Sequence, residues 1–199
     1  MRGWMMAVCC ALGMASLTAT AQMAADAAKG PAAGTIVSPA QAMDSELSLI
    51  EGEMMGAVKA MPAEKFGFAP SAAIFVPGQK TEFATVRSFA QQAAHVAEAN
   101  YYFFSTVGGL KPGVDTSAVE KLTNKDDVVA ALAASFAFGH KAIATLTAAN
   151  AFEVLNAPEP GVQTRVTLAG FAISHANDHY GQMVEYLRMN GLVPPASAR

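Results

Sequence analysis

Residues 174–182 read Ser-His-Ala-Asn-Asp-His-Tyr-Gly-Gln and lie inside a long helical pattern. His175 and His179 are four residues apart in this stretch, and residues at that spacing are neighbours on one face of an α-helix. Two imidazoles on one face can reach the same ion. Because the whole chain has only four histidines, this pair is the strongest chemical signal in the sequence.

The two histidines belong to the last of four predicted helices. This helix is predicted from about residue 162 to residue 190, because a segment rich in Pro and Gly precedes it and Gly191 follows it. One face of the helix carries Leu168, Phe171, Ala172, His175, His179, Gln182 and Tyr186. A mostly apolar face packs toward the core, so both imidazoles are expected to point into the protein.

Three further helices are predicted ahead of this one, over residues 39–61, about 82–107 and about 125–150. The clearest start is at Ser38, which forms a capping-box pattern with Gln41 around a proline at the first helical position. No regular alternation of Val, Ile and Thr indicates a strand. Four long helices without strands predict an all-α fold, a four-helix bundle.

The connections and the third helix add two expectations about packing. Residues 110–124 can span the length of a helix at about 3.3 Å per extended residue, so the second and third helices are able to run parallel. Gly139 lies in the third helix and permits the close approach of a neighbour. The adjacent His140 is interpreted as a residue at the edge of the bundle; as a fourth ligand it would close a metal site.

His95 lies midway along the second predicted helix, on an unusually polar face. Helical bundles build metal sites from inward side chains on facing helices, which makes His95 the natural partner of His175 and His179. Three neutral imidazoles suit zinc, nickel, copper or iron(II), and zinc or nickel is the expected divalent ion. Three protein ligands leave a position for water or substrate, and a bound water would have its pKa lowered to about 7.

Four other polar residues are candidates for roles around this site. Asp178 and Glu98 are candidate hydrogen-bond partners of the ligand imidazoles. Gln182 and Tyr102 are candidates to orient water or substrate. The run from His175 to His179 is superficially similar to the His-x-x-Glu-His signature of inverted zincins, but with a shorter carboxylate.

A single histidine in one helix followed by His-x-x-x-His in a later helix is more specific than either element alone. With these residues the sequence resembles the DinB family of four-helix-bundle metalloproteins. The matching stretches are His95, residues 175–182 (His-Ala-Asn-Asp-His-Tyr-Gly-Gln), residues 187–195 (Leu-Arg-Met-Asn-Gly-Leu-Val-Pro-Pro) and residues 61–66 (Met-Pro-Ala-Glu-Lys-Phe). The resemblance extends over roughly residues 41–195.

The resemblance implies an up-down-down-up bundle, a divalent ion held by His95, His175 and His179, and frequently a homodimer. Characterised members of the family include transferases and isomerases that use bacillithiol, mycothiol or glutathione. Other members are described as metal-dependent hydrolases.

The N-terminal segment predicts export. Residues 1–21 have the features of a signal peptide, with Arg2 ahead of a short apolar stretch and Ala19-Thr20-Ala21 as the cleavage site. Cleavage would remove both cysteines and leave no membrane anchor. A flexible tether is predicted over residues 22–37 and the bundle domain over residues 38–195, so the mature protein is expected to be periplasmic or secreted.

The net charge of the chain and its predicted export limit the functions that it can have. The net charge of −3 and the lack of a basic run argue against nucleic-acid binding. The predicted function is hydrolysis of an unidentified small molecule by metal-activated water, because the thiol cofactors are scarce outside the cytoplasm. The alternatives are a thiol-dependent S-transferase or isomerase, a non-enzymatic metal-binding bundle associated with stress, and a structural bundle without metal.

Overall fold

The computed structural model describes residues 30–71, 74, 76–79, 82–83, 85–157, 161 and 163–198. The predicted signal peptide and the first part of the predicted tether, up to residue 29, lie outside the described residues. Contacts divide the chain into Met1–Val37 and Ser38–Arg199, and the second unit is considered below. Within the described part of the chain, no helix combines the length and the apolar character of a membrane span.

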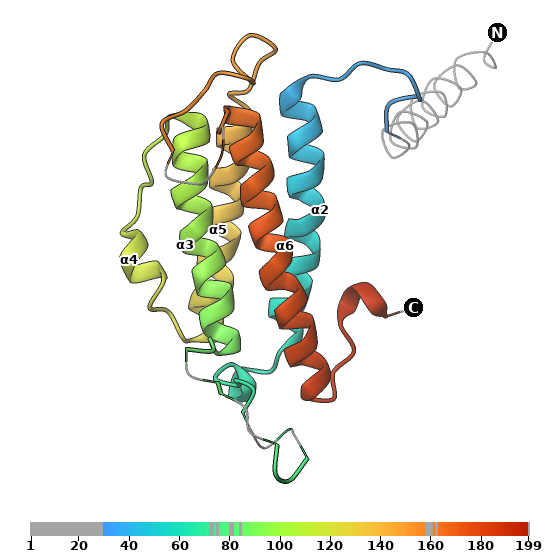
Figure 1. The fold of residues 1–199 in the computed structure, drawn as a ribbon, viewed down its shortest axis with the longest axis vertical. Coiled ribbons are helices and arrows are strands. Elements are labelled where there is room, and N and C mark those ends of the chain that lie inside the picture. Colours follow the sequence, from blue (N-terminus) through green and yellow to red (C-terminus); the bar gives the residue numbers. More distant parts are fainter. Residues whose placement is uncertain are drawn as a thin grey trace, which may run out of the picture. The chain divides into compact units, whose positions relative to one another are not determined.

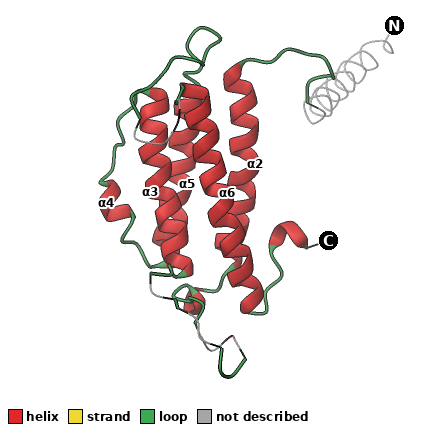
Figure 2. Cartoon of the chain, viewed as in Figure 1, coloured by secondary structure: helices red, strands yellow, loops and turns green. Residues whose placement is uncertain are grey.

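The unit Ser38–Arg199 is built around four long helices (Figure 1). They are α2 (Pro39–Ala60), α3 (Phe89–Gly108), α5 (Lys125–Ile143) and α6 (Arg165–Met189). Short helical turns lie in the connections and at the end: η1 (Ala63–Lys65), α4 (Thr116–Val119) and η3 (Pro195–Ser197). The described residues form no strand (Figure 2), only the isolated bridge between Val154 and Thr164. The prediction of an all-α four-helix bundle is confirmed.

The four helices have the up-down-down-up order that the resemblance implies. Helices α2 and α6 run in one direction, and α3 and α5 run in the other (Figure 1). Both α2 and α3 pack against α5 and α6, so α2 and α3 occupy opposite corners of the bundle. Helices α3 and α5 are parallel neighbours because the connection between them, which contains α4, returns along the outside of α3.

The second predicted helix starts later than expected, at Phe89 rather than near residue 82. Ser88 Oγ accepts a hydrogen bond from the Gln91 amide at 3.3 Å, and Gln91 Oε1 accepts one from the Ser88 amide at 2.8 Å. This capping box fixes the first turn. The amide of Phe89 donates to the carbonyl of Phe68 at 2.8 Å, which ties the same turn to the preceding connection.

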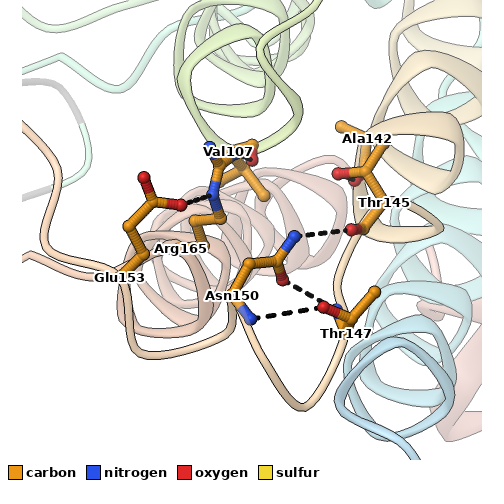
Figure 3. Close-up of polar contacts among 7 residues, drawn as sticks. All are labelled: Val107, Ala142, Thr145, Thr147, Asn150, Glu153 and Arg165. Atoms are coloured by element: carbon orange, nitrogen blue, oxygen red, sulfur yellow. Dashed lines mark hydrogen bonds and ion pairs between the residues drawn. The ribbon is translucent and has the colours of Figure 1, made fainter.

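The third predicted helix ends earlier than expected, at Ile143 rather than at Asn150. The Thr147 amide donates to Asn150 Oδ1 at 2.7 Å, and Asn150 Nδ2 donates to the Thr145 carbonyl at 3.0 Å (Figure 3). Polar side chains that bond to nearby backbone in this way compete with the helical ladder. The pattern of apolar residues alone does not reveal this competition.

An arginine joins the start of α6 to the end of α3. Arg165 Nη1 donates to the Val107 carbonyl at 2.6 Å, and Arg165 Nε donates to Glu153 Oε2 at 2.9 Å (Figure 3). The first bond satisfies one of the carbonyls that the end of a helix leaves without an intrahelical partner. It also fixes how far α6 slides along α3, which matters because these two helices carry the histidines.

Two glycines allow α3 and α5 to approach closely. A Cβ atom on Gly108 would lie 2.8 Å from Ala142 Cα, and one on Gly139 would lie 2.8 Å from the Phe104 ring. The expectation that Gly139 permits close approach is therefore confirmed. A buried hydrogen bond from Asn100 Nδ2 to Ser135 Oγ, 3.0 Å long, joins the same two helices.

Gly108→Ala is expected to lower the free energy of unfolding by about 1–3 kcal/mol, because the added methyl group meets backbone atoms of α5 that cannot rotate away. Gly52→Ala is the control: Gly52 is an exposed residue inside α2 with no neighbour near its Cβ position. There the change is expected to raise the free energy of unfolding by about 0.5–1 kcal/mol. Urea titrations followed by circular dichroism measure both. Equal effects at the two positions would contradict the close contact.

His140 connects α5 to α2 and is not part of the three-histidine group. Its Nδ1 lies 2.6 Å from Asp44 Oδ1 and its Nε2 lies 3.0 Å from Glu51 Oε2. Partial burial alone would lower the pKa of His140, but the hydrogen bonds and charges of Asp44 and Glu51 outweigh it and raise the pKa above its usual 6.5. The expected position at the edge of the bundle is confirmed.

Because the pKa of His140 is raised on folding, its protonated form stabilises the folded state. This contribution is complete below the unfolded-state pKa near 6.5 and is lost as the pH rises through the higher folded-state value. We therefore expect the difference in unfolding free energy between wild type and His140→Gln to be largest near pH 6 and to shrink toward pH 9. Urea titrations across this range provide the measurement, and a difference independent of pH would refute the expectation.

Candidate metal centre

Three histidines from two helices converge at the contact between α3 and α6. His95 comes from α3, and His175 and His179 come from α6. One nitrogen from each ring can be chosen so that all three atoms lie within 4.8 Å of one another. The Nε2 atoms of His175 and His179 are 3.2 Å apart. Two nitrogens bound to one zinc ion at about 2.0–2.1 Å in tetrahedral geometry lie roughly 3.3–3.4 Å apart, so the spacing of this pair is close to that of two ligands of one ion.

Burial keeps these imidazoles uncharged. Burial, followed by the charge of Arg87, lowers the pKa of His95 from 6.5 to about 4. Burial, followed by the neighbouring His175, lowers the pKa of His179 to about 4. Burial also lowers the pKa of His175. A metal binds the neutral imidazole, so the three rings have the required protonation state at neutral pH without any proton being removed.

A chain of hydrogen bonds sets the tautomer of His179. Asp178 Oδ2 accepts from Gln182 Nε2 at 3.1 Å, Gln182 Oε1 accepts from Gln92 Nε2 at 2.7 Å, and Gln92 Oε1 lies 2.5 Å from His179 Nδ1. A carboxylate only accepts hydrogen bonds, so each amide is oriented by the group before it. Gln92 therefore presents its oxygen to His179, whose Nδ1 carries the proton. The Nε2 lone pair is left facing His175.

His95 has a buried nitrogen that lacks a partner. Its Nδ1 is the one buried side-chain nitrogen or oxygen in the described residues without a hydrogen bond. The nearest recorded carboxylate oxygen, Glu120 Oε1, is 3.9 Å away, beyond hydrogen-bonding distance. Leaving such an atom unpaired costs about 1–3 kcal/mol. An ion, or a group bound next to it, would remove this cost, so the ring is suited to a ligand that enters the site.

The other predicted site residues have different positions. Asp178 and Gln182 act through Gln92 and do not contact the ligand-facing nitrogens. Glu98 is half-buried, and burial followed by the charge of Glu120 raises the pKa of its carboxyl group. Tyr102 is 46% exposed, and its ring packs at 5.1 Å against Phe103, which in turn packs at 5.5 Å against His175.

A pocket of about 350 Å³ shares Glu120 with the surroundings of His95, and none of the three histidines lines it. It is lined by Arg87, Gln91, Glu120, Lys121 and Thr123. Glu120 is at once part of the pocket wall and the carboxylate nearest to the unpartnered nitrogen of His95.

Sequence reasoning did not identify three of the residues around the centre: Gln92, Arg87 and Glu120. One sequence signal bears on Glu120. The run Asp115-Thr-Ser is typical of a helix start, and Asp115 does cap α4, the short helix whose C-cap residue is Glu120. Gln92 is three residues before His95 on the same helix, and its burial at 3% exposure marks it as unusual.

Comparison with known proteins agrees with the all-α fold. The sequence profile of the DinB superfamily matches residues 46–183. The chain belongs to the DinB superfamily. It is also similar in structure to a crystallised DinB-like protein from Bacillus cereus ATCC 10987, with a TM-score of 0.62 and 16% identity over 78% of this chain and 95% of that one. No curated protein sequence matches the chain.

Gln92→Met keeps the size of the side chain but removes the oxygen that fixes the His179 tautomer. We expect it to weaken metal binding by about 10- to 100-fold, as for other hydrogen-bond partners of ligand histidines. Gln92→Glu keeps an acceptor at the same place and should bind metal much more tightly than Gln92→Met. Competition with a chromophoric chelator measures the affinities. Equal affinity of Gln92→Met and wild type would show that the amide plays no part.

Proposed function

We propose that this DinB-superfamily protein is a metal-dependent hydrolase whose divalent ion, zinc or nickel, is held by His95, His175 and His179. The single observation that carries the proposal is the convergence of three neutral imidazoles from two helices beside a pocket. Two further features suit an ion: the preset tautomer of His179 and the unpartnered nitrogen of His95.

A bound ion of this kind would supply a Lewis acid and lower the pKa of a coordinated water to about 7. The residues around it have their own tasks. Glu120 lines the pocket with a carboxylate oxygen 3.9 Å from His95 Nδ1, and we assign to this carboxylate the task of accepting a proton from the attacking nucleophile and returning it to the leaving group. Phe103 covers one side of His175 and limits the access of bulk water from that direction.

Glu120 is the preferred proton acceptor over the candidates from the sequence. Asp178 bonds to Gln182 and is occupied with orienting the amides. Glu98 does not line the pocket. Glu120 is half exposed, with 51% of its side chain accessible, so it can exchange its proton with solvent between turnovers.

The test of the metal site compares four histidine variants. His95→Ala, His175→Ala and His179→Ala are each expected to lose the bound ion, because two remaining imidazoles make a much weaker site. His140→Ala should keep it, because His140 binds Asp44 and Glu51 instead. Elemental analysis of protein purified without a polyhistidine tag provides the measurement. Metal retained by all three site variants would refute the proposal.

The reaction class is tested by comparing metal-loaded and chelator-treated protein on panels of esters, amides and thiol acceptors. Hydrolysis that disappears on chelation and returns with zinc or nickel supports the proposal. Glu120→Gln should reduce the rate at saturating substrate by about 10²- to 10⁴-fold, the usual contribution of a general base, while keeping the ion. Activity that requires an added thiol would identify a transferase instead, and metal binding without any turnover would identify a binding protein.

A further inference from the structure

The pocket beside the histidines has a charge pattern that points to its occupant. Its wall contains two cations, Arg87 and Lys121, and one anion, Glu120. Counting +1, +1 and −1, the lining carries a net charge of +1. Gln91 and Thr123 add neutral groups that can form hydrogen bonds. A pocket of about 350 Å³ is large enough for a small organic ligand.

Neither cation is paired with a carboxylate of a described residue at contact distance, although the pKa of Asp115 is lowered by the hydrogen bond of Ser117 and, to a smaller extent, by the charge of Lys121. Among the residues that the structure describes, the ion pairs use other groups, and neither Arg87 nor Lys121 has a carboxylate oxygen within 4.0 Å. Glu120, although on the same wall, pairs with neither. Two cations that share a concave surface repel each other at some cost, and an anion between them would remove it.

The backbone at Arg87 is held in place. Tyr186 of α6 donates its hydroxyl to the Arg87 carbonyl at 3.1 Å, and the next residue, Ser88, is fixed by the capping box of α3. Two residues earlier Thr85 has a φ of 74°, a conformation that β-branched residues rarely adopt. Arg87 therefore lines the pocket from a backbone that is anchored to α6 and adjoins the capped start of α3.

The positive charge of Arg87 also affects the pKa values of the three histidines. Its charge contributes to lowering the pKa of His95, His175 and His179 alike. The pocket that Arg87 lines also contains Glu120, whose Oε1 atom lies 3.9 Å from His95 Nδ1, so a molecule bound to Arg87 occupies a pocket that adjoins the histidines.

We propose that Arg87 and Lys121 hold the carboxylate of the substrate, which is a small ester or amide with a free carboxylate group. This inference rests on the proposed function and adds its substrate class. The planar fork of arginine matches a carboxylate with two parallel hydrogen bonds. A monoanion balances the net charge of +1, whereas a phosphate dianion would exceed it and face Glu120. In hydrolysis the oxygen of water bonds to the carbonyl carbon, the bond to the leaving oxygen or nitrogen breaks, and the leaving group takes a proton.

Binding to the metal-free protein tests the subsite separately from the ion. The probes are N-acetylglycine and N-acetylglycinamide, which differ mainly in the carboxylate, and inorganic phosphate. Nuclear magnetic resonance titration of the chelator-treated full chain measures all three. N-acetylglycine is expected to bind about tenfold more tightly than the amide, the usual scale for hydrogen bonds to a charged group. Equal binding of the two, or tighter binding of phosphate, would overturn the carboxylate assignment.

Variants locate the binding. Arg87→Gln and Lys121→Gln should each remove most of the preference for N-acetylglycine, and Arg87→Lys, which keeps the charge without the fork, should lie between. Lys141→Gln is the matched control, because Lys141 is an exposed lysine on α5 outside the pocket, and it should leave the preference unchanged. An unchanged preference in Arg87→Gln, with the fold verified by circular dichroism, would refute the inference.

The two proposals fail in different ways. If the wild-type protein binds no metal but still prefers N-acetylglycine to its amide, the hydrolase proposal is rejected and the carboxylate subsite is kept. Metal-dependent hydrolysis whose KM for carboxylate-bearing and neutral substrates is equally insensitive to Arg87→Gln would reject the subsite and keep the hydrolase.

Discussion

The contact between α3 and α6 is the constraint on which the rest of the structure depends. Three imidazoles meet there, two of them with Nε2 atoms 3.2 Å apart, and such a group is tolerated inside a bundle only while the rings stay uncharged. Burial itself supplies that condition by lowering the pKa values. The same burial that makes the histidines costly as structural residues therefore makes them suitable as ligands.

The relative position of α3 and α6 is fixed by hydrogen bonds near both of their ends and by the packing of α5 against α3. At one end Arg165 bonds to the Val107 carbonyl, and near the other the Tyr186 hydroxyl bonds to the Arg87 carbonyl. Behind α3, Gly108 and Gly139 let α5 approach until side chain and backbone touch. A helix held in this way cannot rotate or slide to separate His95 from the pair on α6, so the geometry of the centre is a property of the whole bundle.

Much of the fold and the three histidines could be predicted from the sequence, because the signals involve residues close together in the chain. The His-x-x-x-His spacing and the capping box at Ser38 each follow from residues near one another in the chain, and a glycine inside a helix, as at Gly139, is itself a sign of close packing. The start of α3 was predicted too early because the capping box of Ser88 and Gln91 lies inside the predicted helix. The end of α5 was predicted too late because Thr147 and Asn150 bond to nearby backbone. Gln92, Arg87 and Glu120 could not be identified because their importance depends on how α3, α4 and α6 lie against each other.

The connection that carries α4 has a consequence beyond joining two parallel helices. All three histidines come from α3 and α6, whereas Glu120, Lys121 and Thr123 of the pocket wall belong to the segment outside the bundle. That segment is tied to the bundle through α4, whose Val119 joins the buried core. The histidines of the candidate centre and most of the pocket wall near it therefore belong to separate stretches of the chain.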